Sequence, residues 1–364
     1  MKRSIYETNK EDIQSPLKGK NFSETIKNVW KFLFSKEFFE PNQTSLTLLK
    51  AHNSKNTFKN YFKFLSNPLD RPKQFNAMEE KFYREKSKRS FFKKMLRPLT
   101  IIGFTIFLFV LFLAVFAPWI SPYSYIDISL NRHVGSFAQP SPEHLLGTTA
   151  LGRDVLSRLI YGSRKSLSTG LGAITIGYSF GIIFGIIAAY FGGWVDKILM
   201  RIFDLILSFP GLILAMTVIA VLGRSMGNIL FAFGVLAVPG VARLMRSSVL
   251  QVKNNLYIKA AKTAGAKDFK IMFKHILPNA ISPIIISISF AMGSVILGIA
   301  ALTFIGLGEP DIVEWGYDVN VARGKLFNAP WAVLWPGFII AFTALAFILI
   351  GDGLRDALNP RDNV

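Results

Sequence analysis

Residues 257–280 read YIKAAKTAGAKDFKIMFKHILPNA, a basic amphipathic segment between two charge-free hydrophobic stretches. Its apolar residues recur at helical spacing in two sets, one on each side of Gly265. The first set is Tyr257, Ala260, Ala261 and Ala264, and the second is Phe269, Met272, Phe273, Ile276 and Leu277. Glycine often ends a helix in a left-handed conformation, and Pro278 is expected to end the second helix. The pattern predicts a helix, a tight turn and a helix that lie against a membrane face without crossing it.

Small side chains in this segment leave room for a close contact. Ala260, Ala261 and Gly265 would let the surface of another protein approach the backbone. Because the segment is held between two hydrophobic stretches, it is suited to receive mechanical force from a partner.

The composition is that of a membrane protein. Of 364 residues 51% are hydrophobic, the mean hydropathy is +0.36, and phenylalanine alone occurs 33 times. The absence of cysteine excludes disulfides and any cysteine-based metal or nucleophile chemistry. Much of the net charge of +19 lies in residues 1–99, where Lys and Arg outnumber Asp and Glu by 22 to 10. Anionic membrane lipid, and not nucleic acid, is the expected partner of that charge.

Six charge-free stretches are each long enough to cross a membrane. We expect spans near 99–120, 167–191, 204–222, 227–246, 281–305 and 331–350. The third and fourth are separated only by a short polar segment and should form a tight hairpin. The predicted fold class is an all-α polytopic membrane protein with six transmembrane helices and a cytoplasmic helix–turn–helix.

Charge indicates the orientation of these spans. An even number of spans places both termini on one side, and no apolar signal-peptide region follows the first basic residues. With the N-terminus inside, the inner loops hold 12 Lys and Arg and the outer loops hold 8. We therefore expect a multi-pass protein of the plasma (cytoplasmic) membrane with both termini in the cytoplasm.

The interiors of the predicted spans contain no charged side chain. Ion-coupled carriers usually keep an ionisable group at membrane depth, so energy is expected to come from another subunit. Gly177, Gly181 and Gly185 form a G-x-x-x-G-x-x-x-G face that is suited to close helix packing. Pro210 and Pro239 are expected to kink the third and fourth spans.

Residues 1–97 form a basic, aromatic-rich extension with two apolar stripes at helical spacing, beginning at Ile26 and Phe58. Such stripes favour helices that lie in the membrane interface, and a partly disordered tail is an equal alternative. The stretch 78–97 is expected to form an elbow helix that feeds the first span.

The segment at 257–280 resembles a motif of the inner-membrane permease subunits of ABC importers. These subunits carry a cytoplasmic loop of the form EAA, three residues, Gly, nine residues and I-x-L-P. The matching positions are Ala260, Ala261, Gly265, Leu277 and Pro278. Two positions depart from the motif, because Lys259 replaces the acidic residue and His275 replaces the first isoleucine.

Two further stretches resemble the second, C-type permease subunit of dipeptide, oligopeptide and nickel ABC importers. HLLGTTALGRDVLSRLIYGSRKSL at 144–167 is similar to HPLGTDxxGRDVLSRLIYGARxSL, with Thr149 at the usual Asp position. GDGLRDALNPR at 351–361 is similar to GDGLRDALDPR, with Asn359 in place of Asp. The resemblance covers roughly residues 95–364.

The resemblance implies a transmembrane domain at 98–364, after the extension at 1–97, with an ATPase-coupling loop at 254–280. The residues it assigns to that loop are Lys259, Ala260, Ala261, Gly265, His275, Leu277 and Pro278. It implies as partners a homologous second permease subunit, two ATP-binding subunits and an extracytoplasmic substrate-binding protein. ATP and Mg²⁺ would bind the partner ATPases, so no cofactor, metal or enzyme activity is expected on this chain. The implied cargo is a dipeptide or oligopeptide, with nickel chelate or another small solute as the alternative.

Catalytic motifs are absent from the sequence. The four histidines are scattered, and neither a G-x-x-x-x-G-K-[ST] loop nor G-x-S-x-G occurs. Asp154, next to Arg153 and near Arg158, is expected to form a local ion pair at the membrane edge. A membrane enzyme is therefore disfavoured, and a secondary transporter is disfavoured by the charge-free spans.

Overall fold

The computed structural model describes residues 95–130, 135–309 and 312–358, and every regular element in them is a helix. The apolar stripes and most of the elbow helix expected in the N-terminal extension lie outside the described residues. The α-helices are α6 Pro98–Ile120, α7 Tyr125–Leu130, α8 Val155–Phe191, α9 Gly193–Leu207, α10 Gly211–Leu222, α11 Met226–Lys253, α12 Leu256–Thr263, α13 Asp268–Lys270, α14 Leu277–Ala280, α15 Ser282–Leu302, α16 Trp315–Ala322 and α17 Pro330–Leu358. The shorter elements are the π-helices η1 Ile271–Ile276 and η2 Thr303–Leu307 and the 3₁₀ turn η3 Arg323–Lys325.

Five of the described helices are long and apolar enough to cross a membrane. A bent pair of shorter helices makes a sixth candidate span if the pair is counted as one. They are α6, α8, α11, α15 with its π-helical extension, and α17, and the bent pair is α9 with α10. The all-α polytopic fold predicted from the sequence is confirmed. Three spans begin or end well beyond their predicted limits, because α8, α11 and α17 run on into polar sequence that packs against neighbouring elements.

The third span differs from the single helix expected at 204–222. α9 and α10 meet at an angle of 86°, and the break falls at residues 208–210. Pro210 is the N-cap residue of α10, where its missing N–H and fixed φ are tolerated. Pro239, in contrast, lies inside the continuous helix α11. The expected hairpin is present, because Ser225 caps α11 only three residues after α10 ends.

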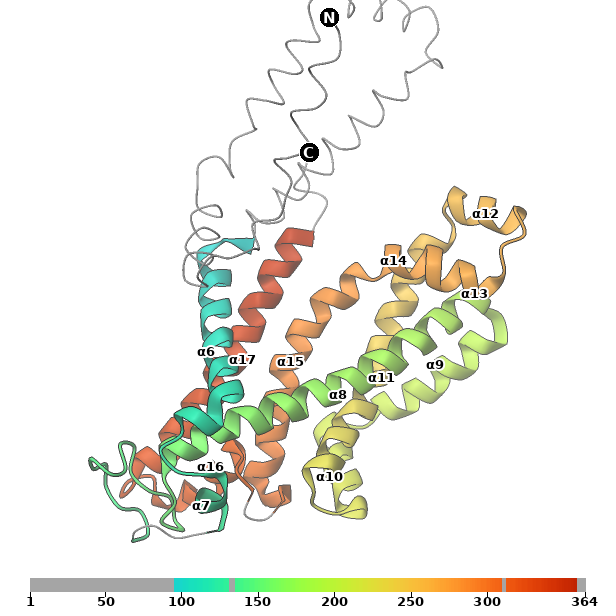
Figure 1. The fold of residues 1–364 in the computed structure, drawn as a ribbon. Coiled ribbons are helices and arrows are strands. Elements are labelled where there is room, and N and C mark those ends of the chain that lie inside the picture. The colour runs from blue at the N-terminus through green and yellow to red at the C-terminus, as the bar shows by residue number, and fades with distance from the viewer. Residues whose placement is uncertain (1–94, 131–134, 310–311, 359–364) are drawn as a thin grey trace, which may run out of the picture. The chain divides into compact units, whose positions relative to one another are not determined.

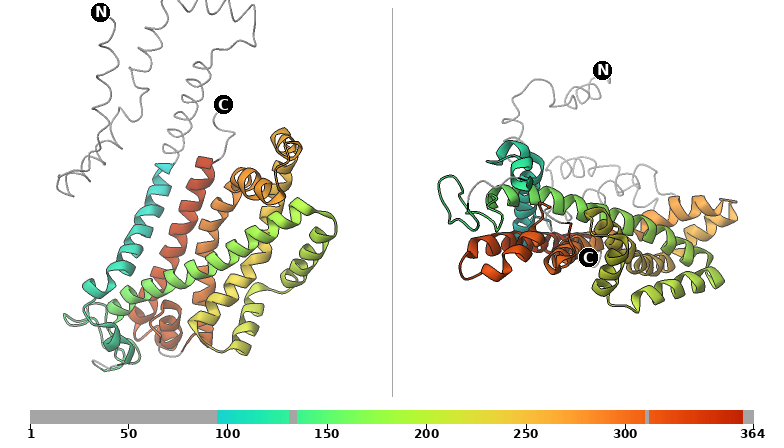
Figure 2. Two further views of the ribbon diagram at one scale, coloured as in Figure 1. Left: turned by 45° about the vertical axis from the view of Figure 1, so that its right-hand side comes forward. Right: turned by 90° about the horizontal axis from the view of Figure 1, so that it is seen from below.

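The helix–turn–helix segment lies at the same end of the helical unit as the start of α6 and the end of α17 (Figure 1). The short helices α7 and α16 lie at the opposite end, and the turned views show the same separation (Figure 2). The segment from α12 to α14 therefore joins two spans at one end of the unit.

The contact between α8 and α11 depends on the predicted glycine face. A Cβ atom built at Gly177 or Gly181 would lie 2.6 Å from a side-chain carbon of α11, and one at Gly185 would lie 2.5 Å from the Ala242 carbonyl oxygen. From the other side, a Cβ at Gly234 would lie 2.9 Å from Ile176. Two helix backbones can approach this closely only where side chains are absent.

The last turns of α17 pack on the beginning of α6. A Cβ built at Gly353 would lie 2.4 Å from the side chain of Thr100, which is buried. Arg97, the residue before α6, pairs with Asp356 near the end of α17. The GDGLRDAL sequence therefore closes the unit by joining its first and last spans.

Replacing Gly185 by Ala should destabilise the chain by about 1–3 kcal/mol, because backbone must move to admit the methyl group. Gly240→Ala is the matched control in the same helix pair, since nothing lies within 4 Å of its built Cβ. Thermal unfolding of the two purified variants in the same detergent measures the difference. Equal melting temperatures for both variants would contradict close packing at α8 and α11.

Candidate functional site

The turn between α12 and α13 has the geometry predicted for Gly265. Gly265 has φ +78°, its N–H donates to the Lys262 carbonyl at 3.0 Å, and the Ala266 N–H donates to the Ala261 carbonyl at 3.1 Å. These two bonds form a Schellman motif, which ends α12 and satisfies carbonyls that would otherwise lack partners. The predicted helix–turn–helix is confirmed, and glycine is required at its centre because other residues disfavour positive φ.

The inner face of the segment is part of the main apolar core. Its buried side chains include Ile258, Ile271 and Ile276, which cluster with Met245 and Val249 of α11. Burying one such side chain contributes about 1.5–3 kcal/mol, so the segment is firmly attached to the spans.

The predicted apolar faces are partly wrong. The first helix buries Ile258 and exposes Tyr257 and Ala260, and the second helix buries Ile271, which lies outside the predicted set. The π-helical geometry of η1 explains the second difference, because it changes which residues share a face relative to an α-helix.

Pro278 does not end the second helix. Helical structure continues to Ala280, and α15 begins at Ser282. Pro278 lies in the first turn of α14, directly after the π-helix, where a missing N–H has little cost. The Asn279 side chain donates to the His275 carbonyl at 2.7 Å, which satisfies an acceptor at this junction.

The structure separates the predicted site residues into two groups. The residues at the exposed tip of the segment are Lys259, Ala260 and Gly265, with Ala261 half-buried beside them. The residues further along, toward α15, are His275 and Leu277, which are half-buried, and Pro278, which is exposed. A built Cβ at Gly265 has no atom within 4 Å, so the tip is open to an approaching surface.

Three residues outside the predicted site hold the second helix of the segment and the end of α11 against α8. The Tyr190 hydroxyl donates to Asp268 Oδ1 at 2.5 Å, at the start of the second helix. Lys253, the last residue of α11, donates from Nζ to the carbonyls of Ala189 and Tyr190 at 3.0 and 2.5 Å. These contacts join residues 63 to 78 positions apart, so no local sequence pattern indicates them.

Two ion pairs attach α9 to α11. Arg246 contacts both carboxylate oxygens of Asp196 at 2.5 Å, and Arg243 contacts Asp204 at 2.7 Å. Paired donors in a fork fix direction as well as distance, so Arg246 holds α9 in one orientation on α11.

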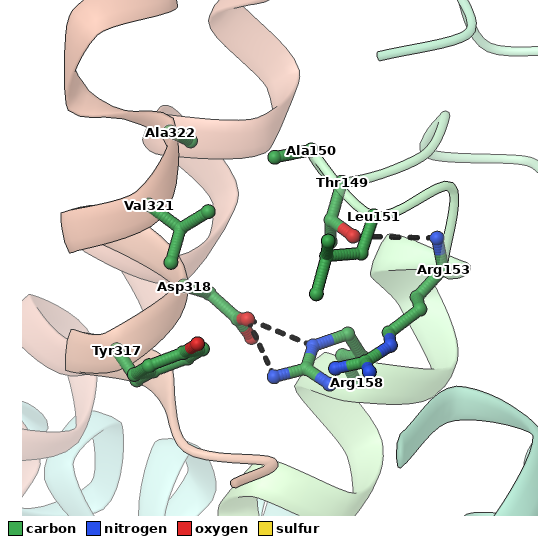
Figure 3. A pocket seen from close by; sticks show the side chains of 9 residues that line it. All are labelled: Thr149, Ala150, Leu151, Arg153, Arg158, Tyr317, Asp318, Val321 and Ala322. Carbon is green, nitrogen blue, oxygen red and sulfur yellow. Dashed lines mark hydrogen bonds and ion pairs between the residues drawn. The ribbon is translucent and has the colours of Figure 1, made fainter. Parts of the chain in front are cut away.

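A second polar cluster lies at the opposite end, where α8 begins. Arg158 faces Asp318 of α16 (Figure 3), and its Nε and one terminal nitrogen both contact Asp318 Oδ1 at 2.7 Å. The same guanidinium donates to the carbonyls of Ile128 and Ile312 at 2.8 and 2.7 Å. This cluster joins four parts of the chain, and breaking such a buried pair typically costs about 3–5 kcal/mol.

Asp154 makes two local polar contacts at the start of α8. It caps α8 by accepting from the Ser157 N–H at 2.8 Å, and its other oxygen lies 3.0 Å from His144 Nδ1. Arg158, one of the two arginines near Asp154 in the sequence, binds Asp318. The space beside this cluster is about 10 Å³, roughly the smallest volume that holds a water molecule. The cluster is therefore structural and too small for a transported solute.

Glu314 caps α16, and burial is the largest influence on the pKa of its side chain. Its carboxylate accepts from the Tyr317 N–H at 2.9 Å, and the Ser166 hydroxyl of α8 lies 3.4 Å away. Burial raises the pKa of this carboxyl above its usual range. The hydrogen bonds of this carboxyl hold α16 against α8.

Apolar spans, with a short helix–turn–helix anchored at one face, define a polytopic helical membrane protein of the transport-permease class. The chain belongs to the family described as binding-protein-dependent transport system inner membrane component, whose model matches residues 181–363. A second model, the N-terminal TM domain of oligopeptide transport permease C, matches residues 89–140. The resemblance to C-type permease subunits of ABC importers is thereby confirmed.

Curated relatives agree with this assignment. A dipeptide transport system permease protein, DppC, of Alkalihalophilus pseudofirmus is 42% identical over 275 residues, which are 75% of this chain and 90% of that protein. A glutathione transport system permease protein, GsiD, of Pectobacterium atrosepticum is 39% identical over 279 residues, 75% of this chain and 91% of that protein. A solved inward-facing MetNI methionine ABC transporter aligns with a TM-score of 0.47 and 18% identity, over 56% of this chain and 97% of that chain.

Tyr190→Phe should destabilise the chain by about 1 kcal/mol, because it removes one hydrogen bond to a carboxylate and keeps the ring. Tyr257→Phe is the control, since no hydrogen bond of that hydroxyl is found among the described residues. Chemical unfolding in detergent, carried out in wild-type and Asp268→Asn backgrounds, gives the coupling between the two side chains. Fully additive effects of Tyr190→Phe and Asp268→Asn would contradict the contact.

Proposed function

We propose that the chain is a permease subunit of an ATP-driven importer for dipeptides or oligopeptides, and that residues 254–280 transmit the motion of ATPase subunits to the spans. One observation carries the coupling role. The segment is anchored to the apolar core through Ile258, Ile271 and Ile276, while it exposes Ala260 and Gly265 at its tip. A load applied at the tip therefore reaches the spans without first deforming the loop.

The proposed assembly contains a homologous second permease subunit, two ATP-binding subunits and an extracytoplasmic substrate-binding protein. The family description supports the last of these, because it names a binding-protein-dependent system. ATP and Mg²⁺ would bind the ATPase subunits, and this chain would form half of the translocation pathway without catalysing a reaction. We propose no cofactor or metal site on it.

The proposed orientation places the helix–turn–helix segment and both termini in the cytoplasm, in the plasma membrane. The start of α6, the end of α17 and the segment lie at one end of the helical unit (Figure 1), which agrees with this orientation. The five lysines of the segment add to the basic side, as the positive-inside rule requires. In this proposal residues 1–97 form a cytoplasmic extension, and residues 98–364 form the transmembrane domain.

Closure of the ATPases would push on α12, and the rigid attachment of the segment would rock the spans between two states. The Tyr190–Asp268 bond and the Lys253 contacts give this push a direct route to the end of α8. The close packing at the glycine face would then move α11 together with α8. The Arg158–Asp318 cluster at the far end of α8 would act as the fixed point of that movement.

The cargo is proposed from the relatives, whose names specify dipeptide and glutathione. Both are short peptides, so a short peptide is the cargo class that they share. The uptake of a labelled dipeptide should be lost when the chain is deleted from its host and restored when it is returned. It should continue when the proton gradient is collapsed while ATP is maintained. If the deletion instead abolishes nickel-chelate uptake, nickel chelate is the cargo. If dipeptide uptake stops when the proton gradient is collapsed, the protein is an ion-coupled carrier.

Gly265→Val should abolish transport and the stimulation of ATP hydrolysis by substrate, because it adds bulk at the open tip and disfavours the φ of +78°. Gly265→Asn separates these two causes, since asparagine tolerates positive φ but carries a side chain. If close approach of the ATPase matters, both variants lose coupled ATP hydrolysis. If only the turn matters, the Asn variant keeps most of it. Normal transport by the Val variant would show that the segment is not the coupling site.

A further inference from the structure

The exposed surface of the segment at 254–280 is strongly basic. Its charged residues are Lys259, Lys262, Lys267, Asp268, Lys270 and Lys274, and all of them are exposed. The only carboxylate among them, Asp268, accepts from Tyr190. None of the five ammonium groups lies in an ion pair with any residue in the described ranges. Five like charges within 16 positions repel one another, which is unfavourable unless opposite charge approaches from outside.

Large apolar side chains stand among these lysines. Leu256 is 83% exposed, Phe269 is 70% exposed and Tyr257 is 43% exposed. The Phe269 ring packs on Phe273 with centroids 4.5 Å apart, so it is held in place on the surface. Exposed aromatic and aliphatic anchors surrounded by charge are typical of a protein-interaction surface.

The charge at the centre of this surface is opposite to that of the motif it resembles. Lys259 stands where the motif has an acidic residue, directly before the exposed Ala260. A partner that attracts an acidic side chain at this position would repel Lys259. The surface that receives this segment must therefore differ in charge at this point.

We propose that the ATPase surface that receives this segment is acidic, with carboxylates placed around an apolar pocket for Leu256 and Phe269. This inference rests on the proposed coupling function of residues 254–280. Charge complementarity would steer the ATPase to the segment and select it against ATPases with a basic surface. The apolar pocket would supply most of the binding free energy, because exposed ion pairs contribute little.

A protein partner fits the surface better than an anionic membrane. Gly265 and Ala260 leave the backbone open at the tip, and a built Cβ at Gly265 has no atom within 4 Å. A close approach to backbone serves a rigid complementary surface, whereas a fluid bilayer does not need one. The tip also lies beyond the ends of α8 and α9 (Figures 1 and 2).

Zero-length cross-linking of the complete complex tests the proposal. A carbodiimide joins a lysine amine to a carboxylate only where the two are in contact. The complex is purified from its host through a tag on this chain, treated with carbodiimide, and analysed by mass spectrometry. We expect bonds between Lys259 or Lys270 and Asp or Glu side chains of the co-purified ATPase subunits. Cross-links found only with a lysine-to-lysine reagent would overturn the acidic surface and leave the coupling function intact.

A charge reversal provides the second measurement. Lys259→Glu should weaken retention of the ATPase subunits about tenfold at low salt, and the difference from wild type should shrink as the ionic strength rises. Arg201→Glu is the matched control, because Arg201 is exposed on α9, outside the segment. Equal retention by Lys259→Glu and wild type at low salt would overturn the inference.

The same preparation distinguishes failure of the acidic-surface proposal from failure of the proposed coupling function. If Gly265→Val still removes the ATPase while Lys259→Glu does not, the coupling function stands and only the acidic surface is wrong. If neither variant affects retention and no cross-link of either kind forms, the coupling function falls as well. If vesicles of anionic lipid, without ATPase, protect Lys259 from amine labelling and neutral vesicles do not, the surface binds lipid and the protein proposal is overturned.

Discussion

The close approach of α8 and α11 is the constraint on which the rest of the unit depends. Gly177, Gly181 and Gly185 bring two backbones within a distance that no side chain would allow. Inside a bilayer the hydrophobic effect does not drive helices together, because lipid tails are as apolar as the helices. Close van der Waals packing is therefore a main source of helix association. The contact places the end of α8 beside the end of α11, and only there can Lys253 reach the last carbonyls of α8.

The helix–turn–helix segment combines two opposite requirements. Its inner face must be immobile relative to the spans, and three buried isoleucines fulfil this requirement. Its outer face must remain free to bind, so it keeps large apolar and basic side chains in contact with water. A loop without a buried face would absorb a push by bending, and one without an exposed face could not receive it.

Much of this arrangement could be predicted from local sequence patterns. Glycine spacing predicted a close helix contact on α8, though not its partner α11, and Gly265 between two amphipathic stretches predicted the turn. Both features depend on geometry within a few residues. The π-helix at Ile271–Ile276 could not be predicted from an α-helical period, and it changed the buried face. Arg158 and Asp318 lie 160 positions apart, and Tyr190 and Asp268 lie 78 apart, so only the tertiary fold brings them together.

The break at residues 208–210 changes how the wall of the unit can move. A helix of 12 residues, such as α10, is about 18 Å long, whereas the hydrocarbon layer is about 30 Å thick. α10 thus covers little more than half of the layer, and α9 continues from it at 86°. The third span therefore consists of two short helices joined by one sharp bend. α9 is bound to α11 through two ion pairs, and α10 through the Asn228 side chain, which donates to the carbonyls of Leu222 and Gly223. A movement of α11 would therefore reach each half of the span separately.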